Sequence, residues 1–215
     1  MSPYLLEQGH EVVVMELPCA DLTATFSDYA QVVCDALIGH RDDVILVGHS
    51  MGGQTIPLVA ARRPVQHLVY LCALVPRVGY GLGEQVVREP TMLSEGWDSA
   101  LSPDGEGRTV WTGKERTKEL LYADCDDSTV FNAIAGLRPQ ANYPLRFPFP
   151  LEEFPPVPTT SVVCRDDQMV GNDWSRAVAK DRLGAALVEM PGSHSPFLSR
   201  PAELAEVLLS VARSR

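Results

Sequence analysis

Short runs of apolar residues alternate along this chain with stretches in which apolar residues recur every three or four positions. The short runs predict β-strands, and the periodic stretches predict amphipathic helices. The predicted strands cover residues 11–15, 44–47, 67–73, 159–164 and 186–190. The predicted helices cover residues 28–40, 54–62, 173–182 and 201–213. Because these strands are apolar throughout and alternate with helices, the predicted fold class is α/β, with a mostly parallel sheet covered by helices on both faces.

This alternation stops between residues 76 and 158, a segment with a glycine-rich start and a proline-rich end. Helical patterns cover residues 114–122 and 127–137 within it, and aromatic residues are frequent. Such aromatic content is more typical of a packed cap or a lined cavity than of a surface loop, which is the alternative. We therefore expect residues 1–75 and 159–215 to form the core and residues 76–158 to form a helical cap over the carboxyl edge of the sheet.

A Gly-x-Ser-x-Gly pattern joins the predicted strand 44–47 to the predicted helix 54–62. Its residues are Gly48, His49, Ser50, Met51 and Gly52. On such a strand-to-helix turn the serine hydroxyl is exposed, and the backbone N–H of the next residue can donate to a developing oxyanion. Ser50 is therefore the candidate nucleophile and Met51 the candidate oxyanion donor. The alternative is an ordinary turn with a serine that caps a helix.

A serine nucleophile needs a base to take its proton and a carboxylate to orient that base. Of the five histidines, His194 is predicted to lie in the loop after the last strand, at the carboxyl edge where open α/β sheets bind ligands. His49 is expected to point away from the nucleophile. Asp167 follows the strand 159–164 at the same edge, and we prefer it to Asp166 as the orienting acid. Turn formation by both aspartates is the alternative.

Composition limits the partners. Lysine and arginine number 18 against 28 aspartate and glutamate residues, and the net charge of −10 disfavours nucleic acid or an anionic membrane as a partner. No apolar run is long enough to span a membrane, and no secretory signal is visible. The five cysteines are odd in number and widely spaced, so we expect reduced thiols, a cytoplasmic protein and no zinc or other metal site. No pattern indicates a cofactor.

Taken together, these motifs resemble the small α/β-hydrolases of the plant methylesterase and hydroxynitrile lyase group. The resemblance lies in residues 48–53, 122–125, 137–140, 164–169 and 192–194. It implies a catalytic triad of Ser50, Asp167 and His194, a small lid over an apolar pocket, and a small-molecule ester as the substrate. The lyases of this group carry a lysine just after the catalytic histidine. Because Ser195 stands there, the resemblance favours ester hydrolysis.

One part of the family pattern is missing. Residues 1–9 look like the end of the family's first helix, so its first strand and the loop that donates a second oxyanion N–H are absent. In the family that strand lies between the strands that correspond to 11–15 and 44–47, and its loss leaves two strand edges to be paired or rearranged. We therefore expect an N-terminally truncated hydrolase in which Met51 is the only identifiable oxyanion donor. A catalytically impaired, hydrolase-like binder of small molecules is the alternative to an active esterase.

Overall fold

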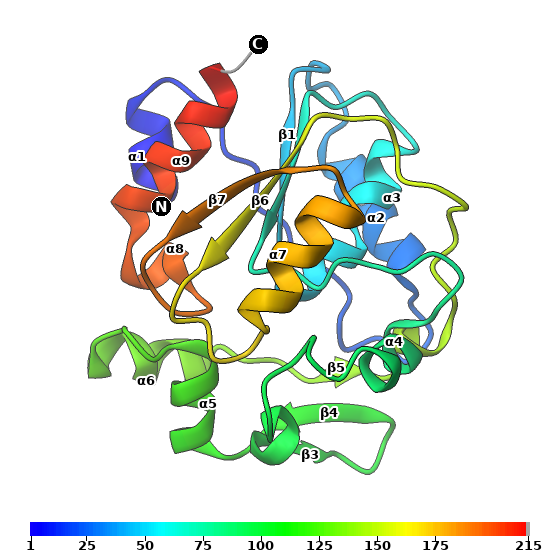
Figure 1. Cartoon of the computed structure of the whole chain (residues 1–215), viewed down its shortest axis with the longest axis vertical. Helices are drawn as coiled ribbons and strands as arrows, with labels where there is room; N and C mark the ends of the chain where they lie inside the picture. The colour runs from blue at the N-terminus through cyan, green and yellow to red at the C-terminus, as the bar shows by residue number, and fades with distance from the viewer. Residues whose placement is uncertain (214–215) are drawn as a thin grey trace.

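The computed structural model describes residues 1–213, and its centre is a parallel sheet of four strands. The strands lie in the order β1-β2-β6-β7, and they span β1 (Ile45–His49), β2 (His67–Leu71), β6 (Thr159–Cys164) and β7 (Ala186–Met190). The α/β prediction is confirmed, and four of the five predicted strands are present. In Figure 1 the arrowheads of β6 and β7 point toward the lower part of the view, where the elements of residues 76–158 lie.

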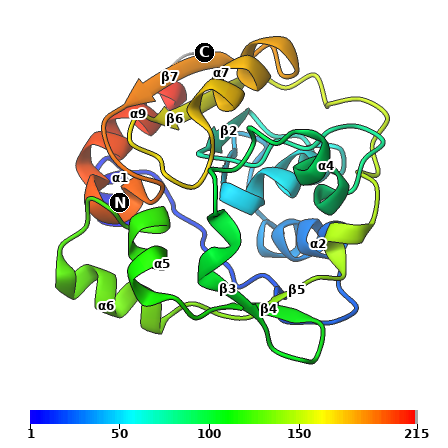
Figure 2. The ribbon, with the colours of Figure 1, turned by 60° about the horizontal axis from the view of Figure 1, so that its bottom comes forward.

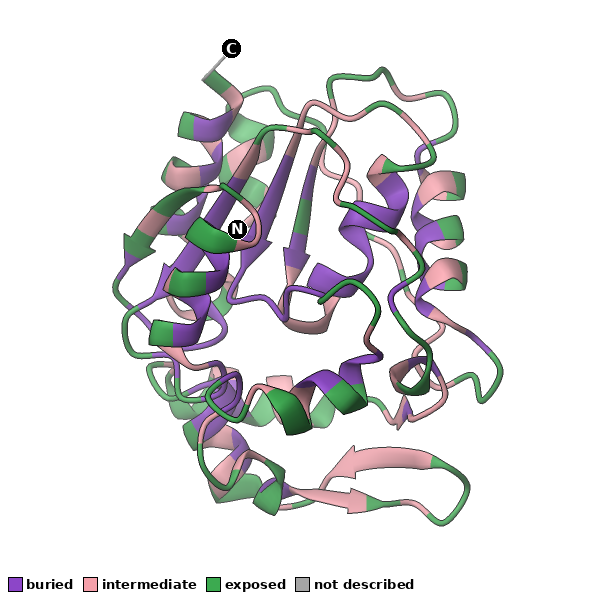
Figure 3. Cartoon of the chain, turned by 45° about the vertical axis from the view of Figure 1, so that its right-hand side comes forward, coloured by how far each residue is buried: buried purple, intermediate pink, exposed green. Residues whose placement is uncertain are grey.

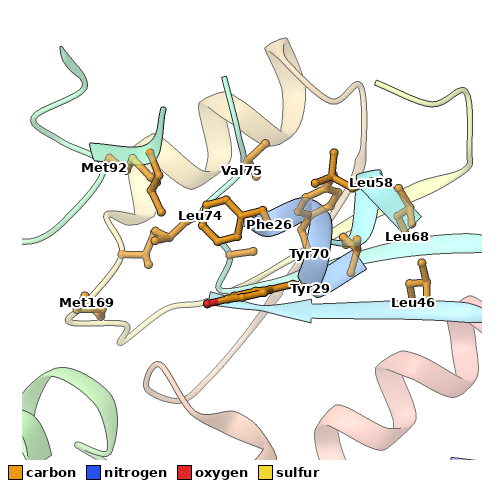
Figure 4. Packing of buried hydrophobic residues seen from close by; sticks show 14 of the residues in the cluster. Phe26, Tyr29, Leu46, Leu58, Leu68, Tyr70, Leu74, Val75, Met92 and Met169 are labelled. Carbon is orange, nitrogen blue, oxygen red and sulfur yellow. The ribbon is translucent and has the colours of Figure 1, made fainter. Parts of the chain in front are cut away.

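Helices cover both faces of this sheet. On one face lie α2 (Phe26–Ala36), α3 (Ile56–Ala60) and α7 (Asn172–Asp181), and on the other lie α1 (Ser2–Glu7), α8 (Pro196–Ser199) and α9 (Pro201–Arg213) (Figure 1). Side chains along β2 alternate between the two layers, because successive residues of a strand point to opposite faces. Leu68 and Tyr70 pack with α2 and α3, as Figure 4 shows, whereas Val69 and Leu71 pack with α9.

The predicted strand at residues 11–15 is wrong: the segment is extended but pairs with no other strand among residues 1–213. Its side chains still alternate, since Val13 and Met15 pack against the core while Val14 is 80% exposed. β1, the first strand of the sheet, has its outer edge unpaired in the described part of the chain. A strand needs a neighbour to satisfy its backbone groups, and apolar alternation alone does not supply one.

The insert contains a second, smaller sheet that the sequence pattern did not predict. Its antiparallel strands are β3 (Leu101–Pro103), β4 (Arg108–Trp111) and β5 (Gln140–Ala141). Its helices are α4 (Leu82–Arg88), η2 (Trp97–Ala100), α5 (Lys114–Leu121), α6 (Asp127–Ala135) and η3 (Pro144–Arg146). Figure 2 shows these elements spread beneath the sheet, and in Figure 3 β3 and β4 lack the fully buried residues of the central strands. Strands this short are below the length at which periodicity can identify them.

Contacts at the end of α4 fix the insert to the core. The Glu89 carboxylate accepts hydrogen bonds from Trp174 Nε1 and from Arg182 Nη2, each at 2.7 Å. Burial favours the neutral acid, but these hydrogen bonds and the Arg182 charge outweigh it and hold the pKa of Glu89 below its ordinary value. Among residues 1–213, no helix combines the length and the hydrophobicity that a bilayer span requires.

Candidate active site

Ser50 lies at a sharp turn between β1 and the short helix η1 (Ser50–Gln54). Its φ angle of 50° is in the left-handed region that favours glycine, and a serine adopts it only where the surroundings impose it. Two neighbouring glycines allow the close packing that does so. A Cβ on Gly48 would lie 2.8 Å from the Gly52 carbonyl oxygen, and one on Gly53 would lie 2.9 Å from that of Leu74. The turn thus holds Ser50 at the carboxyl end of β1.

Asp167 and His194 meet at the carboxyl ends of β6 and β7. His194 Nδ1 donates to the Asp167 carboxylate at 3.0 Å from Oδ2 and 3.2 Å from Oδ1, and only 1% and 2% of the two side chains, respectively, is exposed. The backbone N–H groups of Met169 and Val170 also donate to Asp167 Oδ1, at 2.8 and 3.0 Å. A carboxylate only accepts, so His194 carries its proton on Nδ1 and presents Nε2 as a free acceptor.

The Asp167 carboxylate remains ionised in this buried position. Burial alone would raise its pKa, but the charge and hydrogen bond of His194 and the backbone N–H groups of Val170 and Met169 outweigh burial. The pKa of Asp167 is therefore held below its ordinary value. An ionised acid beside Nδ1 can stabilise an imidazolium when His194 gains a second proton at Nε2.

The neighbouring Asp166 has a different role. Its carboxylate accepts from the Gly192 N–H at 3.2 Å, and its own N–H donates to the Gly192 carbonyl at 3.1 Å. These bonds join the loop after β6 to the loop that carries His194. The carboxylate at the His194 ring is thus that of Asp167, and Asp166 links the two loops.

Ser50 reaches the same edge of the sheet through its neighbour His49. His49 Nε2 donates to the His194 carbonyl oxygen at 2.8 Å, and the two imidazole rings lie 4.7 Å apart between centroids. Burial, and in smaller part the neighbouring His194 imidazole, lower the pKa of His49 to about 3, so the His49 ring is neutral. The Ser50 hydroxyl is half-buried and makes no hydrogen bond within residues 1–213. Such bonds are often long in free enzymes and shorten when substrate binds.

Sequence reasoning did not find the contact of His49 with His194, and it missed Cys72. Cys72 follows β2 with a φ of 44°, and its thiol lies within 4.8 Å of ligand atoms of both Asp167 and His194. These three are the described residues that could hold a metal ion. A hydrogen bond with Cys164 and burial raise the pKa of the Cys72 thiol well above its ordinary value. The thiol is therefore protonated at neutral pH, which is not its metal-binding form.

Comparison with known proteins identifies relatives of this chain. The model of the "Alpha/beta hydrolase family" matches residues 2–207. A pyrethroid hydrolase of Sphingobium wenxiniae is 29% identical over 194 residues, covering 86% of this chain and 69% of the relative. Methylesterase 2 of Arabidopsis thaliana is 23% identical over 99% of this chain and 89% of its own length. The solved pyrethroid hydrolase of Sphingobium faniae superposes with a TM-score of 0.81 at 23% identity, covering 99% and 90% of the two chains. That likeness shows a shared fold.

Proposed function

Because this chain belongs to the alpha/beta hydrolase family, we propose that it is a serine hydrolase that cleaves a small carboxylic ester. The observation that carries the proposal is the buried hydrogen bond between His194 and Asp167, at the edge of the sheet where the Ser50 turn also ends. The names of the relatives, pyrethroid hydrolase and methylesterase, support an ester as the substrate class. We assign the roles of nucleophile, base and acid to Ser50, His194 and Asp167, and we propose that residues 76–158 act as a cap over this site.

In the proposed first half-reaction, Ser50 Oγ attacks the ester carbonyl carbon while His194 Nε2 takes the hydroxyl proton. The carbonyl oxygen becomes an oxyanion that accepts a hydrogen bond from the Met51 N–H, one of the backbone donors that the first turn of η1 leaves unused. The carbon–oxygen bond to the alcohol then breaks, and the alcohol leaves with the proton from His194. An acyl group remains on Ser50.

In the second half-reaction, His194 removes a proton from water, which attacks the acyl group. The bond to Ser50 Oγ breaks, Ser50 regains its proton from His194, and the carboxylic acid leaves. Asp167 keeps its negative charge throughout, which favours the transient imidazolium of His194 and fixes its tautomer.

A second candidate function is small-molecule binding with little turnover, and it is favoured by the outer edge of β1, which has no partner strand among the described residues. In alpha/beta hydrolases a loop before the nucleophile strand supplies a second oxyanion N–H beside that of the residue after the serine. Removal of one such donor costs about 2.7–4 kcal/mol in subtilisin, or about 100- to 1000-fold in kcat. A chain that relies on Met51 alone would hydrolyse esters correspondingly slowly.

Labelling with a fluorophosphonate and hydrolysis of short nitrophenyl esters test both candidates on this 215-residue chain. We expect labelling and hydrolysis by the parent chain, and loss of labelling with a fall in kcat of about 1000-fold or more in Ser50→Ala. Ser102→Ala, a serine substitution in β3, is the matched control and should keep both. Labelling that survives Ser50→Ala would exclude Ser50 as the nucleophile. Specific labelling of Ser50 without ester turnover would favour the binder.

A further inference from the structure

Asp124 is a carboxylate of the insert that contacts the loop carrying His194. It lies in the short connection between α5 and α6, which Figures 1 and 2 place beside α8. Its Oδ1 accepts a hydrogen bond from the hydroxyl of Ser193, the residue directly before His194. Its Oδ2 accepts from Arg200 Nε at 3.1 Å, just beyond α8. One side chain therefore binds both ends of the segment that contains the proposed base.

This contact is buried where it meets the loop. Ser193 is fully buried, and 22% of the Asp124 side chain is exposed. Gly192 has a φ of 118°, and a Cβ there would lie 2.9 Å from Arg200 Cδ and 3.2 Å from Asp124 Oδ2. Only glycine allows the loop to approach this pair so closely. Burial disfavours the charge on Asp124, but the hydrogen bonds from Ser193 and Arg200 outweigh it and hold its pKa below the ordinary value.

The other supports of the loop come from the core. Asp166 holds the backbone of Gly192, and His49 holds the carbonyl of His194. Asp124 alone among these three side chains belongs to the insert. Since a charge-assisted hydrogen bond restricts the Ser193 side chain, it also restricts the backbone one residue from the imidazole.

We propose that Asp124 is a positioning residue, which ties the insert to the His194 loop through Ser193 and so holds the His194 ring in place. This role rests on the proposed function of His194 as the base. If Asp124 has this role, movement of α5 and α6 relative to the core changes the placement of His194. The insert then affects turnover as well as substrate entry. Misplacement of a reacting group by about 1 Å can cost about 100-fold in rate.

Two substitutions remove the contact from opposite sides, Asp124→Ala and Ser193→Ala. We expect each to lower kcat about tenfold with KM within about twofold of the parent, and the double variant to lose no more than either single one, because both remove the same bond. Asp126→Ala is the matched control. Asp126 lies two residues away and caps α6 through Thr129 N–H at 2.9 Å, and among the described residues it makes no hydrogen bond or ion pair with the His194 loop. It should keep the parent kcat.

A second readout does not depend on turnover. The chain has five histidines, so the ¹⁵N signals of the His194 ring can be resolved and assigned with a His194→Gln variant. These signals should move in Asp124→Ala and Ser193→Ala and stay unchanged in Asp126→Ala. Unchanged ring signals in both contact variants would overturn the proposal, as would an equal loss of kcat in the control. If the parent shows no hydrolysis dependent on Ser50, the proposed function fails, and the ring signals alone decide whether Asp124 positions His194.

Discussion

The two ends of the central sheet differ in the segments that lie beside their edge strands and in how their loops are joined. At the β6–β7 end, the two strands pair over five residues, and the loops that carry Asp167 and His194 are joined by the bonds of Asp166 to Gly192. At the β1 end, the outer edge has no partner strand within residues 1–213, and residues 11–15 run beside the core without a ladder. β7 is also an edge strand of this sheet, so the ends differ in their loops: the loops of the proposed acid and base are bonded to each other, whereas the turn of the proposed nucleophile follows a strand whose neighbouring segment, residues 11–15, forms no ladder.

The largest expected effect comes from a substitution at the β6–β7 end, in the loop that carries Asp167. Asp167→Asn keeps the shape of the side chain but removes the charge that holds the His194 tautomer. We expect kcat for ester hydrolysis to fall about 10⁴-fold, as it does after the equivalent Asp-to-Asn change in a serine protease triad, with little change in KM. Steady-state kinetics measure the effect, and Asp166→Asn is the control that should retain most of the activity. A similar loss in both variants would mean that the carboxylates act mainly through loop structure.

A pair of truncations compares the packing of an interior strand of the sheet with that of residues 11–15. Leu68 on β2 is 2% exposed, so Leu68→Ala should lower the free energy of unfolding by about 2–5 kcal/mol through loss of burial and creation of a cavity. Val14→Ala removes methyl groups from a side chain that is 80% exposed and should change it by less than about 0.5 kcal/mol. Urea unfolding of both variants provides the measurement. Equal destabilisation would show that the Val14 side chain is buried in the folded chain.

A further expected effect concerns His49, which connects the two ends of the sheet through its hydrogen bond to the His194 carbonyl. Its pKa is about 3 in the folded chain, chiefly because of burial, against an ordinary value of 6.5. Between pH 6.5 and 3 the unfolded state therefore binds a proton that the folded state does not, and the free energy of unfolding falls as the pH falls through this window. The slope due to this one residue is at most about 1.4 kcal/mol per pH unit.

Unfolding midpoints measured between neutral and acidic pH check this expectation. His49→Gln keeps a side chain that can donate to the His194 carbonyl but cannot titrate, so its stability should depend less steeply on pH than that of the parent. His10→Gln, at an exposed histidine in the connection after α1, is the control and should follow the parent. Identical slopes in the parent and His49→Gln would show that His49 is protonated in the folded chain.

Much of the fold could be predicted because its signals are local. The runs at 159–164 and 186–190 form β6 and β7 with the predicted bounds, and the apolar stripe over 201–213 forms α9. The run at 11–15 has the same pattern and forms no strand, because pairing depends on a neighbour that is distant in sequence or absent. Periodicity describes the side chains of a segment, and it carries no information about the partner of its backbone.

The features of the candidate site also fall into two groups: residues that a local sequence pattern marks, and contacts between residues that are distant in the chain. Ser50 is proposed from its glycine neighbours, and Asp167 and His194 are proposed from their places after predicted strands. The contact of His49 with the His194 carbonyl, the Cys72 thiol beside Asp167, and the bond between Asp124 and Ser193 all join residues far apart in the chain. No local pattern marks them, since each depends on which loops meet at the sheet edge.

The sequence by itself thus determined the parallel α/β core, the tight turn at Ser50 and the chain order of the proposed nucleophile, acid and base. These features depend on residue size, backbone freedom and hydrophobic spacing within short segments. Only the tertiary structure decided that the Asp167 carboxylate, and not that of Asp166, meets His194, that the outer edge of β1 has no partner strand within residues 1–213, and that the insert binds the His194 loop through Asp124. Those outcomes depend on contacts between segments, which form only when the whole chain packs.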